Sequence, residues 1–159
     1  MTCISSTSMA VLWNGKPTTS FKPERGIRQG DPLSPYIFVL CMERLSQLIQ
    51  AKVHTGEWKT IKLGQQGVHL SHLFFADDLV LFGHATTDQA SLINTIMQEF
   101  CLSSGHKVSQ SKTKIYFSKN VEPSLCKAIC DKLGFQKTLS LGKYLGVQLL
   151  TGRVSSTTF

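Results

Sequence analysis

Three segments of this chain repeat apolar residues with the spacing of an α-helix. The first begins at Ser34-Pro35, where the serine suits the N-cap and the proline the first helical position. Its apolar face comprises Ile37, Cys41, Leu45 and Leu48. The second opens with a capping box at residues 86–89 and is expected to end at Gly105. Its apolar face comprises Leu92, Ile93, Ile96, Met97 and Phe100. A third helix is expected from Pro123 to the residue before Gly134.

Two hairpins are predicted where short β-prone runs meet turn residues. The apolar stretch from Ala10 to Trp13 leads into Asn14-Gly15, a strong turn signal, and Phe21 is expected to begin the returning strand. Further along, apolar runs within residues 70–82 flank Ala76-Asp77-Asp78. This pattern predicts an antiparallel hairpin with two exposed carboxylates at its tip.

The rest of the chain carries weaker signals. Residues 55–67 are expected to form a loop or a weak hairpin. Short strands are expected near Val108, at residues 115–117 and at residues 144–149. The predicted helices would pack on one face of a small antiparallel sheet, which is an α+β architecture. We expect one domain over residues 1–150 and a frayed tail over residues 151–159.

Composition and charge narrow the class of protein. The 159 residues are 42% hydrophobic and 17% charged, which is typical of one globular domain. The net charge of +7 suits a polyanionic partner and equally suits a merely basic domain. No apolar run is long enough to span a bilayer, and no secretion signal is evident. We therefore expect an intracellular protein, cytoplasmic or nuclear, that does not contact membranes.

Cysteine and histidine offer little metal chemistry in this sequence. The five cysteines are odd in number and include no Cys-x-x-Cys motif, so we expect buried thiols rather than disulfides. Cys126 and Cys130 would share a helical face as packing residues. His69 and His72 have a spacing seen in metal sites, but no third ligand is evident and zinc is not favoured.

The adjacent carboxylates of Asp77 and Asp78 are the strongest chemical signal. Two neighbouring carboxylates between apolar strands repel each other and lose hydration unless a positive charge offsets both effects. Mg²⁺ prefers such oxygen ligands together with substrate phosphates, and polymerases use two ions about 4 Å apart. The alternative is an exposed acidic turn, since Asp is common in turns.

Four sequence blocks, in order, resemble a known family. They are RGIRQGDPLSP at residues 25–35, FADD at residues 75–78, SGHKVSQSKTK at residues 104–114 and KYLGV at residues 143–147. Together they cover the chain from about Trp13 to Leu150. The set is similar to reverse transcriptases, and most similar to those of non-LTR (LINE-type) retrotransposons. The resemblance implies part of a polymerase palm and the reaction of an RNA-directed DNA polymerase, in which a primer 3′-hydroxyl attacks a deoxynucleoside triphosphate.

The resemblance also implies a role for individual residues. Asp77 and Asp78 would bind the catalytic metal, Mg²⁺ with Mn²⁺ as an alternative. Lys112 would stabilise charge on the triphosphate or donate a proton to pyrophosphate, and its alternative is a plain surface lysine. Residues near the template and nucleotide would be Arg25, Arg28, Gln29 and Gly30. The primer grip would contain Tyr144, Leu145 and Gly146. The implied partners are an RNA template, a DNA primer and a dNTP.

The sequence also departs from the family pattern. The family's first catalytic aspartate lies upstream of the segment that begins near Met9, and none of the first eight residues here is acidic. Position 109 is Ser where many relatives carry Asn. We therefore expect a fragment without fingers and thumb, inactive by itself, whose partner would be the upstream part of the same polyprotein.

Two alternative functions stay open. One is a non-catalytic remnant that binds nucleic acid through its positive charge. The other is a phospho-acceptor receiver domain, whose doubly wound fold also places acidic residues after an apolar strand. An apolar strand follows Asp78 immediately, without room for a helix, and this disfavours the receiver fold.

Overall fold

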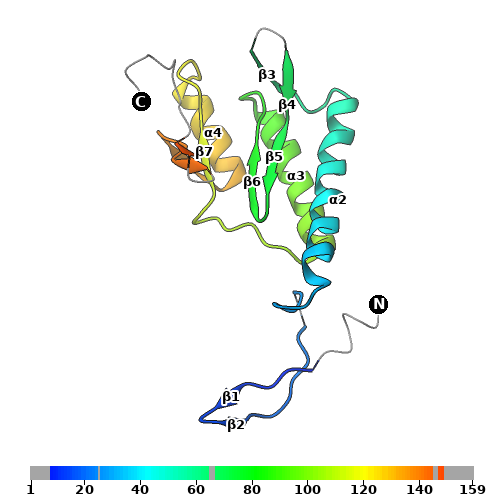
Figure 1. Cartoon of the computed structure of the whole chain (residues 1–159). Coiled ribbons are helices and arrows are strands. Elements are labelled where there is room, and N and C mark those ends of the chain that lie inside the picture. Colours follow the sequence, from blue (N-terminus) through cyan, green and yellow to red (C-terminus); the bar gives the residue numbers. More distant parts are fainter. Residues whose placement is uncertain (1–7, 25, 65–66, 145–146, 149–159) are drawn as a thin grey trace.

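The computed structural model describes residues 8–24, 26–64, 67–144 and 147–148. The helices are α2 (Ser34–His54), α3 (Thr87–Ser104) and α4 (Pro123–Leu133). The strands are β1 (Leu12–Trp13), β2 (Lys16–Pro17), β3 (Ile61–Leu63), β4 (Val68–Leu70), β5 (His72–Phe75), β6 (Asp78–Leu81), β7 (Lys114–Tyr116), β8 (Gln136–Thr138), β9 (Lys143–Tyr144) and β10 (Val147–Gln148). This mixture confirms the expected α+β class (Figure 1).

The helix ends follow the predicted capping residues, with one shift. Thr86 is the N-cap of α3, and its side chain accepts a hydrogen bond from the backbone N–H of Gln89. Gly105 and Gly134 end α3 and α4 in the left-handed conformation, at φ 75° and 74°. The predicted N-cap of α2 was wrong by one residue. Leu33 holds that position, because Ser34 is already helical and its hydroxyl donates to the carbonyl of Arg28 at 2.5 Å.

The strands form separate pairs among the described residues, and most of the pairs are hairpins. β1 pairs with β2, β3 with β4, β5 with β6 and β9 with β10, all antiparallel. β7 and β8 are parallel, with α4 in the connection between them. The helices therefore do not pack on one continuous antiparallel sheet. The strand after the acidic pair returns directly alongside β5, which excludes the receiver arrangement.

Three strand predictions need correction. The return of the first hairpin begins at Lys16, and Phe21 makes only an isolated bridge with Met9. No strand forms at Val108. The segment at residues 144–149 is not one strand, because β9 and β10 pair with each other, with Tyr144 opposite Val147. The strand predicted at residues 115–117 is present one residue earlier, as β7.

The core lies between α2, α3 and the β5–β6 hairpin (Figure 1). Its buried residues are Leu45 and Ile49 of α2, Trp58, and Ile96 and Phe100 of α3. Phe74, Leu79 and Leu81 bring the hairpin against this cluster. Removing these apolar surfaces from water fixes the hairpin to the two helices.

The segment between α2 and β3 is held by hydrogen bonds to α3 and to the residues that follow β6. The Trp58 indole donates to the carbonyl of Phe82 at 2.9 Å. The backbone N–H of Lys59 donates to Oε1 of buried Gln89 at 2.8 Å, and that of His84 donates to the Lys59 carbonyl at 3.2 Å. Trp58 thus has its polar atom satisfied while its ring is buried.

The β1–β2 hairpin forms an arm that extends away from the helices (Figure 1). Its large apolar side chains are exposed, with Leu12 and Trp13 at 72% and 73%. Within the part of the chain that the structure describes, no helix is long and apolar enough to cross a bilayer.

Candidate metal-binding hairpin

Asp77 and Asp78 lie at the closed end of the β5–β6 hairpin, as predicted. Ala76 and Asp77 form the turn, and Asp78 begins β6 opposite Phe75. Both carboxylates are exposed. Ala76 has a φ of 47°, in the left-handed region that costs a residue with a Cβ about 1–2 kcal/mol. The tip is therefore a tight turn in which the adjacent acidic residues face solvent.

The hairpin packs here because every second residue of β5 and three consecutive residues of β6 are half-buried. In β5, His72 and Phe74 are half-buried while Leu73 and Phe75 are exposed. In β6, Leu79 and Leu81 contact the core, and Asp78 is exposed. β-branched and aromatic residues favour such half-buried strands, and Asp is common in turns.

In the part of the chain that the structure describes, no side chain neutralises the charge at the tip. Among the described residues, neither Asp77 nor Asp78 has a side-chain hydrogen bond or an ion pair; an ion pair of 3.0 Å joins Lys52, near the end of α2, to Glu57 in the segment after it. The two carboxylates therefore offer free oxygen ligands to a cation. In the same described residues, no group of three or more His, Cys, Asp or Glu side chains is placed to hold a metal. The carboxylate oxygens suit Mg²⁺ or Mn²⁺, but the two side chains do not by themselves complete a metal site.

A histidine lies at the open end of the same hairpin. The ring of His72 is within 3.0 Å of the Ser46 hydroxyl on α2 through Nε2 and within 2.9 Å of the Ser71 hydroxyl through Nδ1. It also contacts the Phe74 ring at a centroid distance of 4.9 Å. Burial lowers the pKa of His72, and the charge of Glu43 opposes that shift. His69 lies on the neighbouring strand β4, where it is exposed and hydrogen-bonds Thr60.

The predicted template-binding loop is a sequence of turns before α2. Arg28 and Gln29 are exposed, and Asp31 accepts a hydrogen bond from the backbone N–H of Leu33 at 2.9 Å. Gly30 has a φ of 83°, and an added Cβ would meet no atom of this chain within 4 Å. The glycine is needed here for its backbone conformation. Arg25 lies outside the described residues.

The remaining predicted residues lie on the C-terminal part. Lys112 is exposed in the turn before β7, next to a hydrogen bond from the Thr113 N–H to the Ser109 carbonyl at 2.9 Å. The backbone of Tyr144 lies in β9. Leu145 and Gly146 lie outside the described residues.

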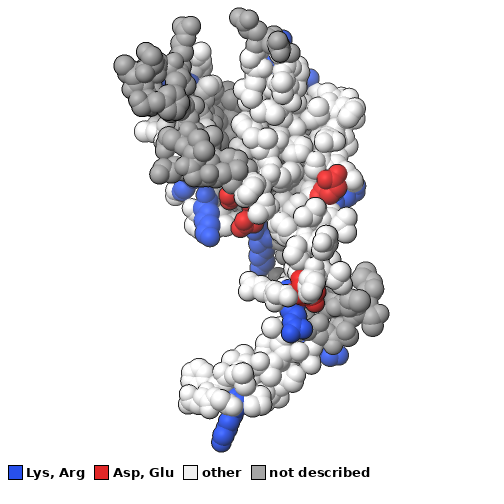
Figure 2. Space-filling view, viewed as in Figure 1, with Lys and Arg blue, Asp and Glu red and all other residues white. Residues whose placement is uncertain are grey.

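The structure places the tip, the start of α2 and the end of α3 at one end of the body (Figure 1). The His106 ring, just beyond α3, lies 5.9 Å from Phe38 of α2 and 5.2 Å from Phe100 of α3. Lys and Arg side chains lie at this lower end beside Asp and Glu side chains, and again on the N-terminal arm (Figure 2). Three of the four sequence blocks thus have described residues at this end.

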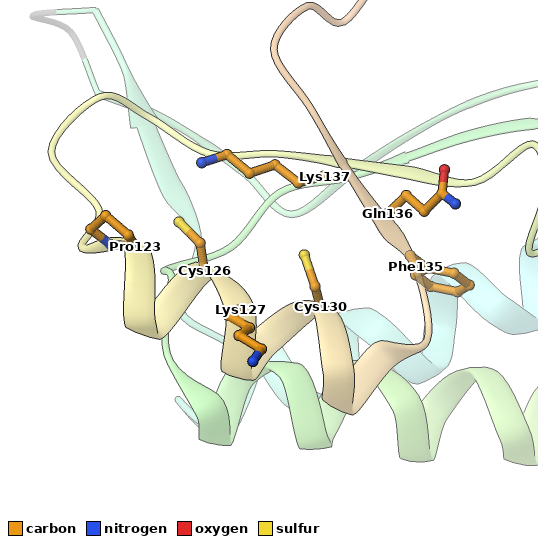
Figure 3. Close-up of a pocket in the computed structure, with 7 residues that line it drawn as sticks. All are labelled: Pro123, Cys126, Lys127, Cys130, Phe135, Gln136 and Lys137. Atoms are coloured by element: carbon orange, nitrogen blue, oxygen red, sulfur yellow. The ribbon is translucent and has the colours of Figure 1, made fainter.

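A separate hollow of about 430 Å³ lies between α4 and β8. Cys126 and Cys130 point into it below Lys137 (Figure 3). Burial raises the pKa of the Cys130 thiol. Cys126 is 3% exposed, and its thiol donates toward the Val121 carbonyl at 3.9 Å. Cys126 is buried, as expected of a packing residue, whereas Cys130 is only half-buried.

Comparisons with known proteins identify the family. A family profile described as reverse transcriptase (RNA-dependent DNA polymerase) matches residues 2–149. An uncharacterized mitochondrial protein of Arabidopsis thaliana is 46% identical over 41% of this chain and 53% of its own length. A retrovirus-related Pol polyprotein from type-2 retrotransposable element R2DM of Drosophila melanogaster is 29% identical over 89% of this chain. The chain spans 53% and 13% of these two relatives. The profile and the retrotransposon relative confirm the resemblance drawn from the sequence blocks, and the chain belongs to the reverse transcriptase family, on the non-LTR retrotransposon side.

Proposed function

We propose that this chain supplies the Asp77–Asp78 part of the two-metal site of a reverse transcriptase that copies an RNA template onto a DNA primer. The primer 3′-hydroxyl attacks the α-phosphate of a dNTP, a new phosphodiester bond forms, and pyrophosphate leaves. The observation that carries the proposal is the pair of unpartnered carboxylates at the tip of a hairpin that the core fixes in place.

Asp77 and Asp78 would bind the metal through their carboxylate oxygens. Mg²⁺ is the expected ion, with Mn²⁺ as the alternative, since both prefer oxygen ligands. When bound, the ions activate the attacking hydroxyl and stabilise the leaving oxygen. The short turn at Ala76 and the packing of Phe74 and Leu79 hold the two side chains at the tip. Such fixed placement is what metal-assisted transfer requires.

The other predicted residues would hold the substrates. Lys112 would stabilise negative charge on the triphosphate, because a cation near the leaving pyrophosphate lowers the barrier. Arg25 and Arg28 would contact phosphates, and Gln29 and Gly30 would lie beneath the templating base pair. Tyr144, Leu145 and Gly146 would position the primer end. These assignments follow the sequence blocks, and the exposure of Arg28, Gln29, Gly30 and Lys112 supports them.

We propose that further metal ligands come from another polypeptide segment. The described residues contain no group of three or more acidic, His or Cys side chains that could hold an ion. Two ions on a triphosphate need several protein oxygens, normally from separate strands. The upstream part of the same polyprotein is the expected source, and the much longer retrotransposon relative is consistent with such a source.

Primer extension tests this proposal. The purified chain, with primer–template, dNTPs and either Mg²⁺ or Mn²⁺, should extend no primer. Addition of the corresponding upstream segment of a related polyprotein, fused or in trans, should restore extension. Asp77→Ala should then abolish it, while Asp131→Ala, at an exposed aspartate of α4, should leave it unchanged. Extension that survives Asp77→Ala would show that the metal site lies elsewhere.

A non-catalytic nucleic-acid-binding function is the second candidate, and the net charge of +7 favours it. In that case the chain would bind primer–template with an affinity that falls steeply with salt. The upstream segment would restore no extension. A fluorescence-anisotropy titration at several salt concentrations, run beside the extension assay, separates the two functions.

A further inference from the structure

His72 is a polar residue in an apolar position. It lies on the half-buried side of β5 with Phe74, and the hairpin packs on α2 and α3 through apolar contacts from Phe74, Leu79 and Leu81. The other two residues of β5, Leu73 and Phe75, face solvent. A histidine at this place loses hydration, and its two ring nitrogens need partners.

Both ring nitrogens have such partners, and the partners belong to two different elements. Nε2 contacts the Ser46 hydroxyl on α2, and Nδ1 contacts the Ser71 hydroxyl just before β5. Gln50, one turn further along α2, donates to the same Ser46 oxygen at 3.5 Å. The Ser46 hydroxyl can therefore donate its proton to Nε2 of a neutral His72 ring. Nδ1 of that ring then donates to the Ser71 hydroxyl.

This contact is directional, whereas the apolar contacts of Phe74, Leu79 and Leu81 with the core are not. Apolar packing is proportional to buried area and tolerates small sliding of one element on another. A hydrogen bond weakens steeply when its distance or angle changes. The Ser46–His72 bond therefore specifies where β5 lies along α2. Four consecutive residue pairs, from His72–Leu81 to Phe75–Asp78, connect this contact to the tip of the hairpin. The position of the tip therefore depends on the position of His72.

We infer that His72 is a positioning residue for the Asp77–Asp78 metal site, and that it acts by fixing the base of the β5–β6 hairpin to Ser46 of α2. The inference rests on the proposed function. The His72 ring acts in its neutral form, because a charged imidazolium would lose hydration at this place. The charged ring would also need both serine hydroxyls to accept a hydrogen bond from it. Glu43, three residues before Ser46 on α2, is the charged group that acts on the ring.

Mn²⁺ titration of the ¹⁵N-labelled full chain, followed by paramagnetic broadening of the amide signals of Asp77 and Asp78, tests the inference. His72→Leu should require about 2- to 30-fold more Mn²⁺ for the same broadening, the range by which residues remote from a site modulate binding. His72→Gln, which can still hydrogen-bond Ser46, should remain near the wild type. His69→Leu is the matched control, since its exposed ring hydrogen-bonds Thr60, outside the β5–β6 hairpin, and it should leave the titration unchanged.

Two further measurements distinguish failure of the positioning role from misfolding and from failure of the proposed function. If His72→Leu does not fold, Ser46→Ala removes the same bond from the helix side and should weaken Mn²⁺ binding in the same range. Amide chemical shifts of residues 76–78, recorded without metal, should move in His72→Leu and return in His72→Gln. Broadening that survives Asp77→Ala would contradict the proposed function. Unchanged tip shifts and unchanged Mn²⁺ dependence in both His72→Leu and Ser46→Ala would overturn the positioning role.

Discussion

Gly83 lies against Gln89, which is a buried polar side chain. A Cβ at position 83 would come within 3.0 Å of Gln89 Cγ and 3.1 Å of Cδ. Gln89 cannot move away freely, because it is 3% exposed and its Oε1 accepts the Lys59 N–H. We expect Gly83→Ala to lower the free energy of unfolding by about 1–3 kcal/mol, as overpacking does.

Urea denaturation with a double-mutant cycle checks this expectation. Gln89→Ala removes the crowding atoms, so Gly83→Ala should cost much less in that background. An equal cost in both backgrounds would contradict steric crowding by Gln89 as the cause.

Stability should depend on pH through His72. Burial holds its pKa below the ordinary value of 6.5, so the unfolded chain binds this proton more readily than the folded chain. The stabilising contribution is therefore complete above pH 6.5 and is lost as the pH falls from there through the lowered pKa. Urea midpoints measured between pH 7.5 and 5 should fall in the wild type. His72→Gln should remove this part of the fall, whereas His69→Gln should retain it.

For single residues, the sequence predicted where exposed side chains lie better than it predicted the hydrogen-bond partners of buried ones. The place of Asp77 and Asp78 at a hairpin tip was predicted because apolar β-prone runs flank residues that favour a turn, while their metal-binding role stays a prediction. His72 was considered only as a zinc ligand, because its partner Ser46 is 26 residues away in sequence. Gln89 was expected to complete a capping box, but its side chain bonds Lys59 instead. Such partners depend on tertiary packing, which local spacing does not encode.

The start of α3 depends on one side chain. Thr86 accepts the Gln89 N–H at 3.1 Å, whereas Thr87, the next residue, is the first residue of the helix and exposed. We expect Thr86→Ala to lower the free energy of unfolding by about 1 kcal/mol, the usual effect of losing an N-cap. Thr87→Ala should change it by less than about 0.5 kcal/mol, since alanine has the higher helix propensity. Thermal unfolding followed by circular dichroism measures both variants, and equal losses would argue against the cap.

Helices were more predictable than strands in this chain. The helices α3 and α4 end at Gly105 and Gly134 as expected, because an apolar face and a capping residue are local signals. β8 was missed, since Gln136, Lys137 and Thr138 have no apolar alternation and pair with β7 beyond an intervening helix. Phe21 was misassigned because the Asn14-Gly15 turn already sets a two-residue hairpin that returns at Lys16.

The molecule as a whole exposes two apolar surfaces at its N-terminal end. One is on the arm, with Leu12 and Trp13, and the other is on the first turns of α2, with Tyr36 and Leu40 at 71% and 69% exposure. Exposed apolar surface of this kind promotes association. Light scattering should therefore show a mass that rises with protein concentration. Leu12→Lys with Leu40→Lys should suppress that rise, while Lys16→Arg should not; a wild-type chain that stays monomeric throughout would contradict this expectation.

Every described strand pairs with the strand next to it in the sequence. Loops that close between neighbouring elements lose little chain entropy, and proteins built from such contacts fold rapidly. On the ribosome, each hairpin can therefore form as soon as its second strand has emerged. The packing of Leu45 and Ile49 against Ile96 and Phe100 must wait for the end of α3. Synthesis of α3 is thus the step at which a set of separate local hairpins becomes a cooperative body.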